Sequence, residues 1–82
     1  MKNLPVHNTF MSITVFHYDN PLERDFATIY TSVENVKLSL HSWVSYSDGK
    51  EELARLMLRL GRMPEVRKHE NYTCYELHGF LD

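Results

Sequence analysis

Three residues near the end of the sequence, Cys74, Glu76 and His78, carry the side chains best suited to chemistry. They alternate, so in a β-strand they would share one face in steps of about 7 Å. A thiol, a carboxylate and an imidazole are metal ligands, and a thiol with an imidazole is also the nucleophile arrangement of some enzymes. Cys74 is the only cysteine, whereas metal sites of the cysteine type bring several at close spacing. We therefore predict that Cys74 is a small buried apolar residue, and that the chain has no catalytic, metal or cofactor site.

Gly49 and Lys50 form the other candidate motif, a phosphate-binding loop. Such a loop needs a glycine five residues before the Gly-Lys pair and a serine or threonine directly after it. Val44 and Glu51 occupy those positions, and the Glu51 carboxylate would repel phosphate. The pair is better explained as the first turn of a helix.

Arg55, Arg59 and Arg62 fall on one side of that helix at about 100° per residue. They are either a solvated face with Glu51 and Glu52 as ion-pair partners, or a binding surface. Residues 55–68 carry a net charge of +4 and the rest of the chain −6, giving −2 in all. Dedicated nucleic-acid domains are usually basic overall, so this balance favours a protein partner. Nucleic-acid binding remains the alternative, and it would use Arg55, Arg59, Arg62, Arg67 and Lys68.

Trp43 lies on the polar face of a predicted strand over residues 36–46. There it is either covered by another element or exposed as an interface anchor, because Trp, Tyr and Arg dominate binding hot spots. In the second case, Lys37 and His41 would flank it on the same face.

The elements that position these residues can be read from hydrophobic periodicity. Residues 36–46 alternate as a half-buried antiparallel strand, and 11–18 and 72–80 are also β-rich. Residues 49–61 fit a helix capped by Asp48, and Gly61 provides the residue that ends it. Its buried stripe is expected to be Leu53, Leu56, Met57 and Leu60.

Residues 21–34 fit two structures. Asn20-Pro21 and a following glutamate resemble a helix start, and the apolar residues would share one helical face. The stretch FATIYTSV, however, is rich in the β-branched and aromatic residues that favour strands, and it could form a hairpin with 36–46. The predicted class is α+β: an antiparallel sheet of three to four strands packed by one helix at 49–61, with a second helix at 21–34 as one option. Residues 1–10 are expected to be a flexible arm before a single domain at 11–82.

Length and composition set further limits. A chain of 82 residues is one domain with a modest stability margin, which association as a homodimer or with a partner would increase. One cysteine allows no internal disulfide, and no apolar run is long enough for a membrane span. We expect a cytoplasmic protein that does not contact membranes.

In size, acidity, absence of motifs and the order strand, strand, helix, strand, the chain resembles small phage-encoded inhibitors of bacterial defence systems, the anti-CRISPR type. The resemblance concerns general architecture and transfers no functional residue. It implies an inhibitor or regulator that occupies a surface of a larger bacterial protein or nucleoprotein complex. In that case the acidic side could face a basic groove of the target, through Asp19, Glu23, Asp25, Glu34 and Glu70. The predicted function is thus a non-catalytic protein-binding module.

Overall fold

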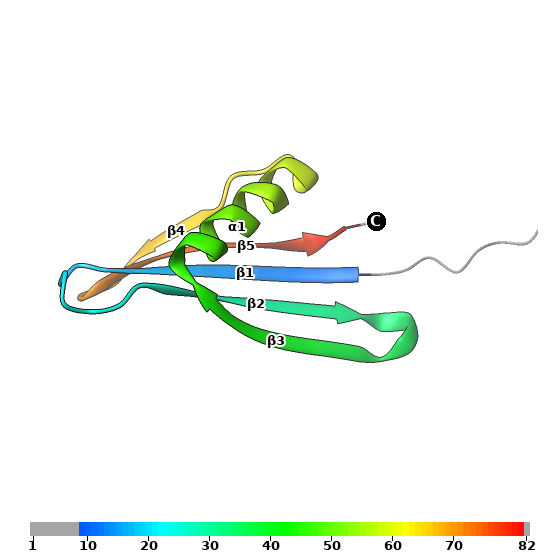
Figure 1. Cartoon of the computed structure of the whole chain (residues 1–82). Coiled ribbons are helices and arrows are strands. Elements are labelled where there is room, and N and C mark those ends of the chain that lie inside the picture. Colours follow the sequence, from blue (N-terminus) through cyan, green and yellow to red (C-terminus); the bar gives the residue numbers. More distant parts are fainter. Residues whose placement is uncertain (1–8, 82) are drawn as a thin grey trace, which may run out of the picture.

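The computed structural model describes residues 9–81, which form an antiparallel sheet with one α-helix packed across one face (Figure 1). The sheet has five strands in the order β3-β2-β1-β5-β4, so β1 is central and β3 and β4 are the edges. The predicted α+β class is confirmed, but the expectation of three to four strands was too low. The elements are β1 (Thr9–Tyr18), β2 (Phe26–Val33), the 3₁₀ turn η1 (Glu34–Val36), β3 (Leu38–Ser45), α1 (Tyr46–Leu60), β4 (Glu65–Lys68) and β5 (Tyr72–Phe80).

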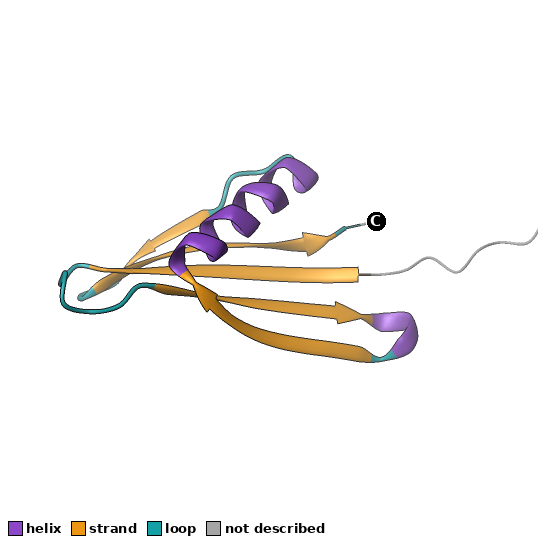
Figure 2. Cartoon of the chain, viewed as in Figure 1, coloured by secondary structure: helices purple, strands orange, loops and turns teal. Residues whose placement is uncertain are grey.

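Residues 21–34 contain no α-helix, and the hairpin is the alternative that the structure adopts. β2 pairs with β3 from Phe26↔Ser45 to Val33↔Leu38, and η1 makes the connection. Figure 2 shows α1 and η1 as the helical segments of the described residues. The β-branched and aromatic residues of FATIYTSV therefore outweighed the helix-start signal before them.

The start of β1 and the presence of β4 were also unexpected. Thr9 and Phe10, predicted to belong to the arm, begin β1, and the rest of that arm lies outside the described residues. β4 was not predicted at all, because three of its four residues are charged. It forms a strand because it pairs with β5, from Glu65↔Glu76 to Lys68↔Thr73.

The helix begins three residues earlier than predicted. Ser45 is the N-cap, and its side chain accepts a hydrogen bond from the backbone N–H of Asp48 at 3.1 Å. Asp48, predicted as the cap, lies in the first turn, where its negative charge favours the helix start. The predicted end is confirmed: Gly61 takes the left-handed conformation at φ 67°, and its N–H donates to the carbonyl of Met57.

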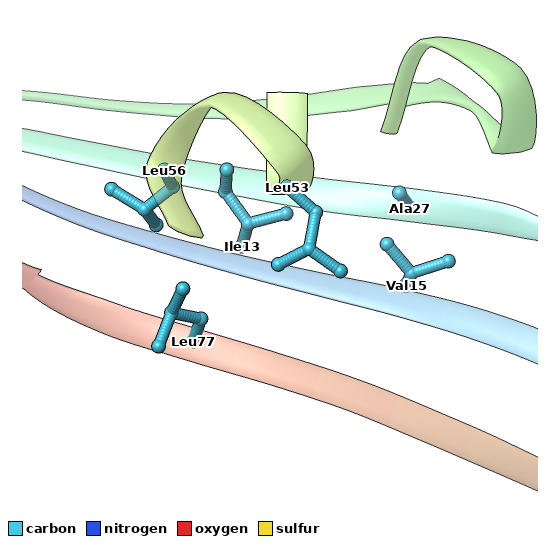
Figure 3. Close-up of a cluster of buried hydrophobic side chains, with 6 residues drawn as sticks. All are labelled: Ile13, Val15, Ala27, Leu53, Leu56 and Leu77. Carbon is cyan, nitrogen blue, oxygen red and sulfur yellow. The ribbon is translucent and has the colours of Figure 1, made fainter. Parts of the chain in front are cut away.

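The core lies between α1 and the middle strands of the sheet. Leu53 and Leu56 of the helix point toward Ile13, Val15, Ala27 and Leu77 of the strands (Figure 3). Met57 and Leu60 pack at the edge of this cluster, so the predicted stripe is the face that holds the helix on the sheet.

Candidate functional site

The face of the sheet opposite α1 is covered by no other element of residues 9–81, and we call it the open face. Pairing register and strand alternation assign to it every second residue of each strand. Its members are Phe10, Ser12, Thr14, Phe16 and Tyr18 of β1, Phe26, Thr28, Tyr30 and Ser32 of β2, Ser39, His41, Trp43 and Ser45 of β3, Glu65 and Arg67 of β4, and Tyr72, Cys74, Glu76, His78 and Phe80 of β5.

One row of aromatic rings crosses four strands of the open face, and we call it the Trp43 row. Trp43 lies 4.8 Å from Phe26, Phe26 stacks on Phe16 at 4.6 Å, and Phe16 lies 6.0 Å from Tyr72, between ring centroids. The inner rings cover one another, but Trp43 at the edge strand is 76% exposed. A large apolar ring therefore contacts Phe26 on one side and is open to contact from outside.

A second cluster of rings lies at the other end of the open face. Phe10 on the central strand lies 6.3 Å from Tyr30, 5.8 Å from His78 and 5.3 Å from Phe80, again between ring centroids. Tyr30 in turn lies 4.5 Å from His41 on β3. The two aromatic groups are separated by a polar strip, Ser12, Thr14, Thr28 and Glu76.

A hollow of about 610 Å³ adjoins the exposed ring of Trp43 where β3 ends. Its lining includes Arg24, Asp25, Phe26 and Tyr46, so it combines apolar walls with one charge of each sign. The site thus offers a projecting ring and, next to it, a recess that could receive a side chain of a partner.

Asp25 has a structural role at the rim of that hollow. Its carboxylate accepts hydrogen bonds from the backbone N–H of Tyr18 and from Nδ1 of His17, both at 2.8 Å. The bond from Tyr18, followed by that from His17, holds the pKa of Asp25 below its ordinary value despite partial burial. Asp25 therefore stays ionised while it fixes the connection between β1 and β2.

The three arginines predicted to share one helical face make contacts within the chain, and Arg62 lies beyond the end of α1. Arg55 forms an ion pair with Glu52 at 2.8 Å and approaches Glu51 at 4.0 Å, which is the arrangement of a solvated face. Arg59 and Arg62 donate to backbone carbonyl oxygens at and just beyond the end of β5. Their charges remain near the surface, but their side chains also hold the end of α1 against the sheet.

Arg67 and Lys68 are successive residues of β4 and therefore point to opposite faces. Arg67 pairs with Glu65 at 3.0 Å, and Lys68 pairs with Asp19 at 2.8 Å. The basic region over residues 55–68 is thus divided between the helix and both faces of an edge strand.

The remaining residues predicted to bind a partner are spread over the molecule. His41 lies two residues from Trp43 on the open face, whereas Lys37 lies in the turn before β3, with a left-handed backbone. Asp19 and Glu23 line a separate hollow of about 450 Å³ at the connection between β1 and β2. The structure therefore brings His41 together with Trp43, and it places Lys37 and the two acidic residues elsewhere.

Cys74, Glu76 and His78 share the open face, as their spacing indicated. Cys74 is buried, and this burial, with a smaller effect from Glu76, raises the pKa of its thiol. A raised pKa leaves less of the reactive thiolate at neutral pH. Within residues 9–81, no group of three or more histidine, cysteine, aspartate or glutamate side chains is arranged to hold a metal ion.

Alternation along the strand placed Trp43 and His41 on one face, as the register confirms, but it did not reveal the aromatic surface around them. The signal was the alternation of Phe16 and Tyr18 in one strand and of Phe26 and Tyr30 in the next. The rings become one surface only through the register of three strand pairs, which the sequence does not show.

Comparison of the chain with protein-family models, curated proteins and solved structures found no match. No helix of the described residues is long and apolar enough to cross a membrane. The functional argument therefore rests on the open face itself.

Proposed function

We propose that this chain is a non-catalytic protein-binding module that uses the open face of its sheet as the contact surface and Trp43 as the anchor. The observation that carries the proposal is the exposure of Trp43 at the end of an aromatic row. Exposed tryptophan and tyrosine rings supply much of the binding energy in protein interfaces, because they bury a large area at a small cost in side-chain entropy.

The charge of the open face favours a protein over nucleic acid as the partner. Its formal charges are the carboxylates Glu65 and Glu76 and the guanidinium Arg67, which already pairs with Glu65. Binding to a phosphate backbone needs several cations in one groove, and carboxylates oppose it. The fitting partner is a folded protein surface with exposed apolar side chains and a basic group near Glu76.

The resemblance to small phage-encoded inhibitors suggests what kind of protein the partner is. An inhibitor or regulator of this size acts by occupying a surface of a larger bacterial complex. The open face would serve as that covering surface, and the hollow beside Trp43 would receive a projecting side chain of the target.

The test combines capture with a matched pair of variants. Tagged wild-type protein, Trp43→Ala and Leu58→Ala are used as baits in nuclease-treated bacterial lysate and washed at two salt concentrations. Leu58 is a suitable control because it is 85% exposed and lies on the helix, away from the open face. We expect one protein to be retained by the wild type and by Leu58→Ala, and to be lost with Trp43→Ala.

The captured protein is then purified and its Kd measured by calorimetry. A hot-spot residue contributes about 2 kcal/mol or more, so Trp43→Ala should raise Kd at least ~30-fold. Equal affinity of Trp43→Ala and wild type would refute the proposed surface. In a parallel capture from lysate without nuclease, nucleic acid that elutes at high salt, in place of a protein, would support the arginine-based alternative.

A further inference from the structure

The two edges of the sheet differ in how they are protected from pairing with other strands. Natural edge strands avoid such pairing by being short, by carrying charges or proline, or by having a bulge. β4 follows this rule: it has four residues, three of them charged, and comes directly after Pro64. β3 has eight residues, LSLHSWVS, without proline, lysine, arginine, aspartate or glutamate, and its register with β2 is continuous.

β3 also exposes apolar side chains on both faces. Leu38 and Leu40, on the helix side, are 61% and 62% exposed, and Trp43 projects from the open face. The leucines are uncovered because α1 begins at the far end of β3 and runs across β1 toward β5 (Figure 1). One edge of the sheet is thus long, without formal charge, and carries three exposed large apolar side chains.

We propose that β3 pairs antiparallel with β3 of a second copy of this chain, about a two-fold axis perpendicular to the sheet. This symmetry keeps the two helices on the same side, so the two five-stranded sheets become one continuous sheet. Leu38 and Leu40 of each copy then pack against the helix-side residues of the other β3. The backbone N–H and C=O groups at this edge gain partners.

The charges at the ends of β3 fit a second copy in this orientation. Lys37 precedes the strand, and the exposed acidic residue Asp48 lies shortly after it in the first turn of α1. Antiparallel pairing brings the end of each copy that carries Lys37 to the end of the other that carries Asp48, twice in the dimer. The neutral strand between them introduces no like-charge repulsion.

This inference does not depend on the proposed function. Pairing at the edge leaves the open face uncovered and places two copies of it side by side. A partner could therefore bind to the monomer or to the dimer.

The oligomeric state can be measured by sedimentation over ~1 μM to 1 mM protein. We expect wild type to associate with Kd in the micromolar range. Leu40→Lys places a charge on the edge, as natural edge strands do, and should weaken association at least ~100-fold. Leu58→Lys is the control: it adds the same charge at a leucine of α1 that is even more exposed than Leu40, and it should associate like wild type.

Hydrogen exchange gives a second readout that does not depend on a variant. Amide exchange in β3 should slow as the protein concentration is raised, while exchange in the other edge strand, β4, stays constant. A wild type that is monomeric at 1 mM, or a Leu40→Lys variant that associates normally, would overturn the proposal. If Leu40→Lys still captures the protein partner, partner binding does not require dimerisation, and the proposed function can hold even if the dimer does not form.

Discussion

Gly49 shows how one residue sets the distance between helix and sheet. It is buried in the first part of α1, and a Cβ built on it would overlap the Cβ of Ala27 on β2. The same Cβ would also contact Val15 on the central strand. Glycine here allows the start of the helix to lie directly on two strands.

We predict that Gly49→Ala destabilises the domain by about 1–3 kcal/mol, as over-packing of a core does. The effect of Gly→Ala here is opposite in sign to its effect at an exposed helix position, where alanine is more favourable than glycine by up to ~1 kcal/mol. Urea denaturation measures the change in the free energy of unfolding. The double variant Ala27→Gly with Gly49→Ala should lose less free energy of unfolding than the two single variants lose together. If the two losses simply added, the proposed contact would be contradicted.

At the scale of elements, the start of α1 depends on Ser45, the last residue of β3. Serine and aspartate are both common N-caps, and Ser45 and Asp48 are three residues apart, so the sequence offers two starts. The earlier start satisfies a backbone N–H with the Ser45 hydroxyl and keeps Asp48 in the first turn. Strand and helix therefore join without a loop.

Ser45→Ala should lower the free energy of unfolding by about 1 kcal/mol, the usual cost of losing an N-cap. Ser47→Ala, two residues later and also exposed, is the control and should change it by less than ~0.5 kcal/mol. Thermal unfolding followed by circular dichroism compares the two. An equal loss for both variants would mean that the cap contributes no more than an ordinary surface serine.

Elements with strong hydrophobic periodicity could be predicted from the sequence, whereas an element that forms only by pairing with a neighbouring strand could not. The leucine stripe of α1 and the alternation of residues 36–46 indicated the helix and one strand. The strand, however, spans only Leu38–Ser45, and Leu38 and Leu40, expected on the buried face, are exposed because α1 does not reach them. β4 has no such signal, because its residues are charged and its strand exists only through pairing with β5. The apolar residues of FATIYTSV fall on both faces of a strand, and the structure explains this pattern: Ala27 and Ile29 face the helix, while Phe26 and Tyr30 belong to the open face.

The same reason limits prediction of the candidate site. Trp43 and His41 could be assigned to one face from a single strand, since alternation within a strand is local. Their aromatic neighbours come from β1, β2 and β5, and a register shift of one residue would send those rings to the other face. The surface therefore belongs to the sheet and to no single segment.

At the scale of the whole molecule, a small core leaves little excess stability. The buried cluster contains Ile13, Val15, Ala27, Leu53, Leu56 and Leu77. A domain of this length has roughly 4–12 kcal/mol of total stability, so one core leucine represents a large share of it. Stability is thus concentrated where α1 crosses the middle strands.

We predict that Leu56→Ala costs about 3 kcal/mol, since Leu56 is almost fully buried. Leu58→Ala, two residues along the same helix but exposed, should cost less than ~0.5 kcal/mol. The midpoint of urea unfolding distinguishes them. Similar midpoints for the two variants would show that α1 is not packed as described.

The central position of β1 has a consequence for how the chain folds during synthesis. Ile13 pairs on one side with Ile29 and on the other with Leu77, so one neighbour of this strand is translated soon after it and the other much later. The β1–β2–β3 meander and the helix can assemble early, but one side of β1 stays unpaired until β5 leaves the ribosome. Closing such a long-range pair is slow, and it leaves a nascent chain with an open strand edge in its middle. Folding of this small protein should therefore end with the pairing of β5 to β1, together with β4 on its outer edge, and the ribosome itself would delay that step.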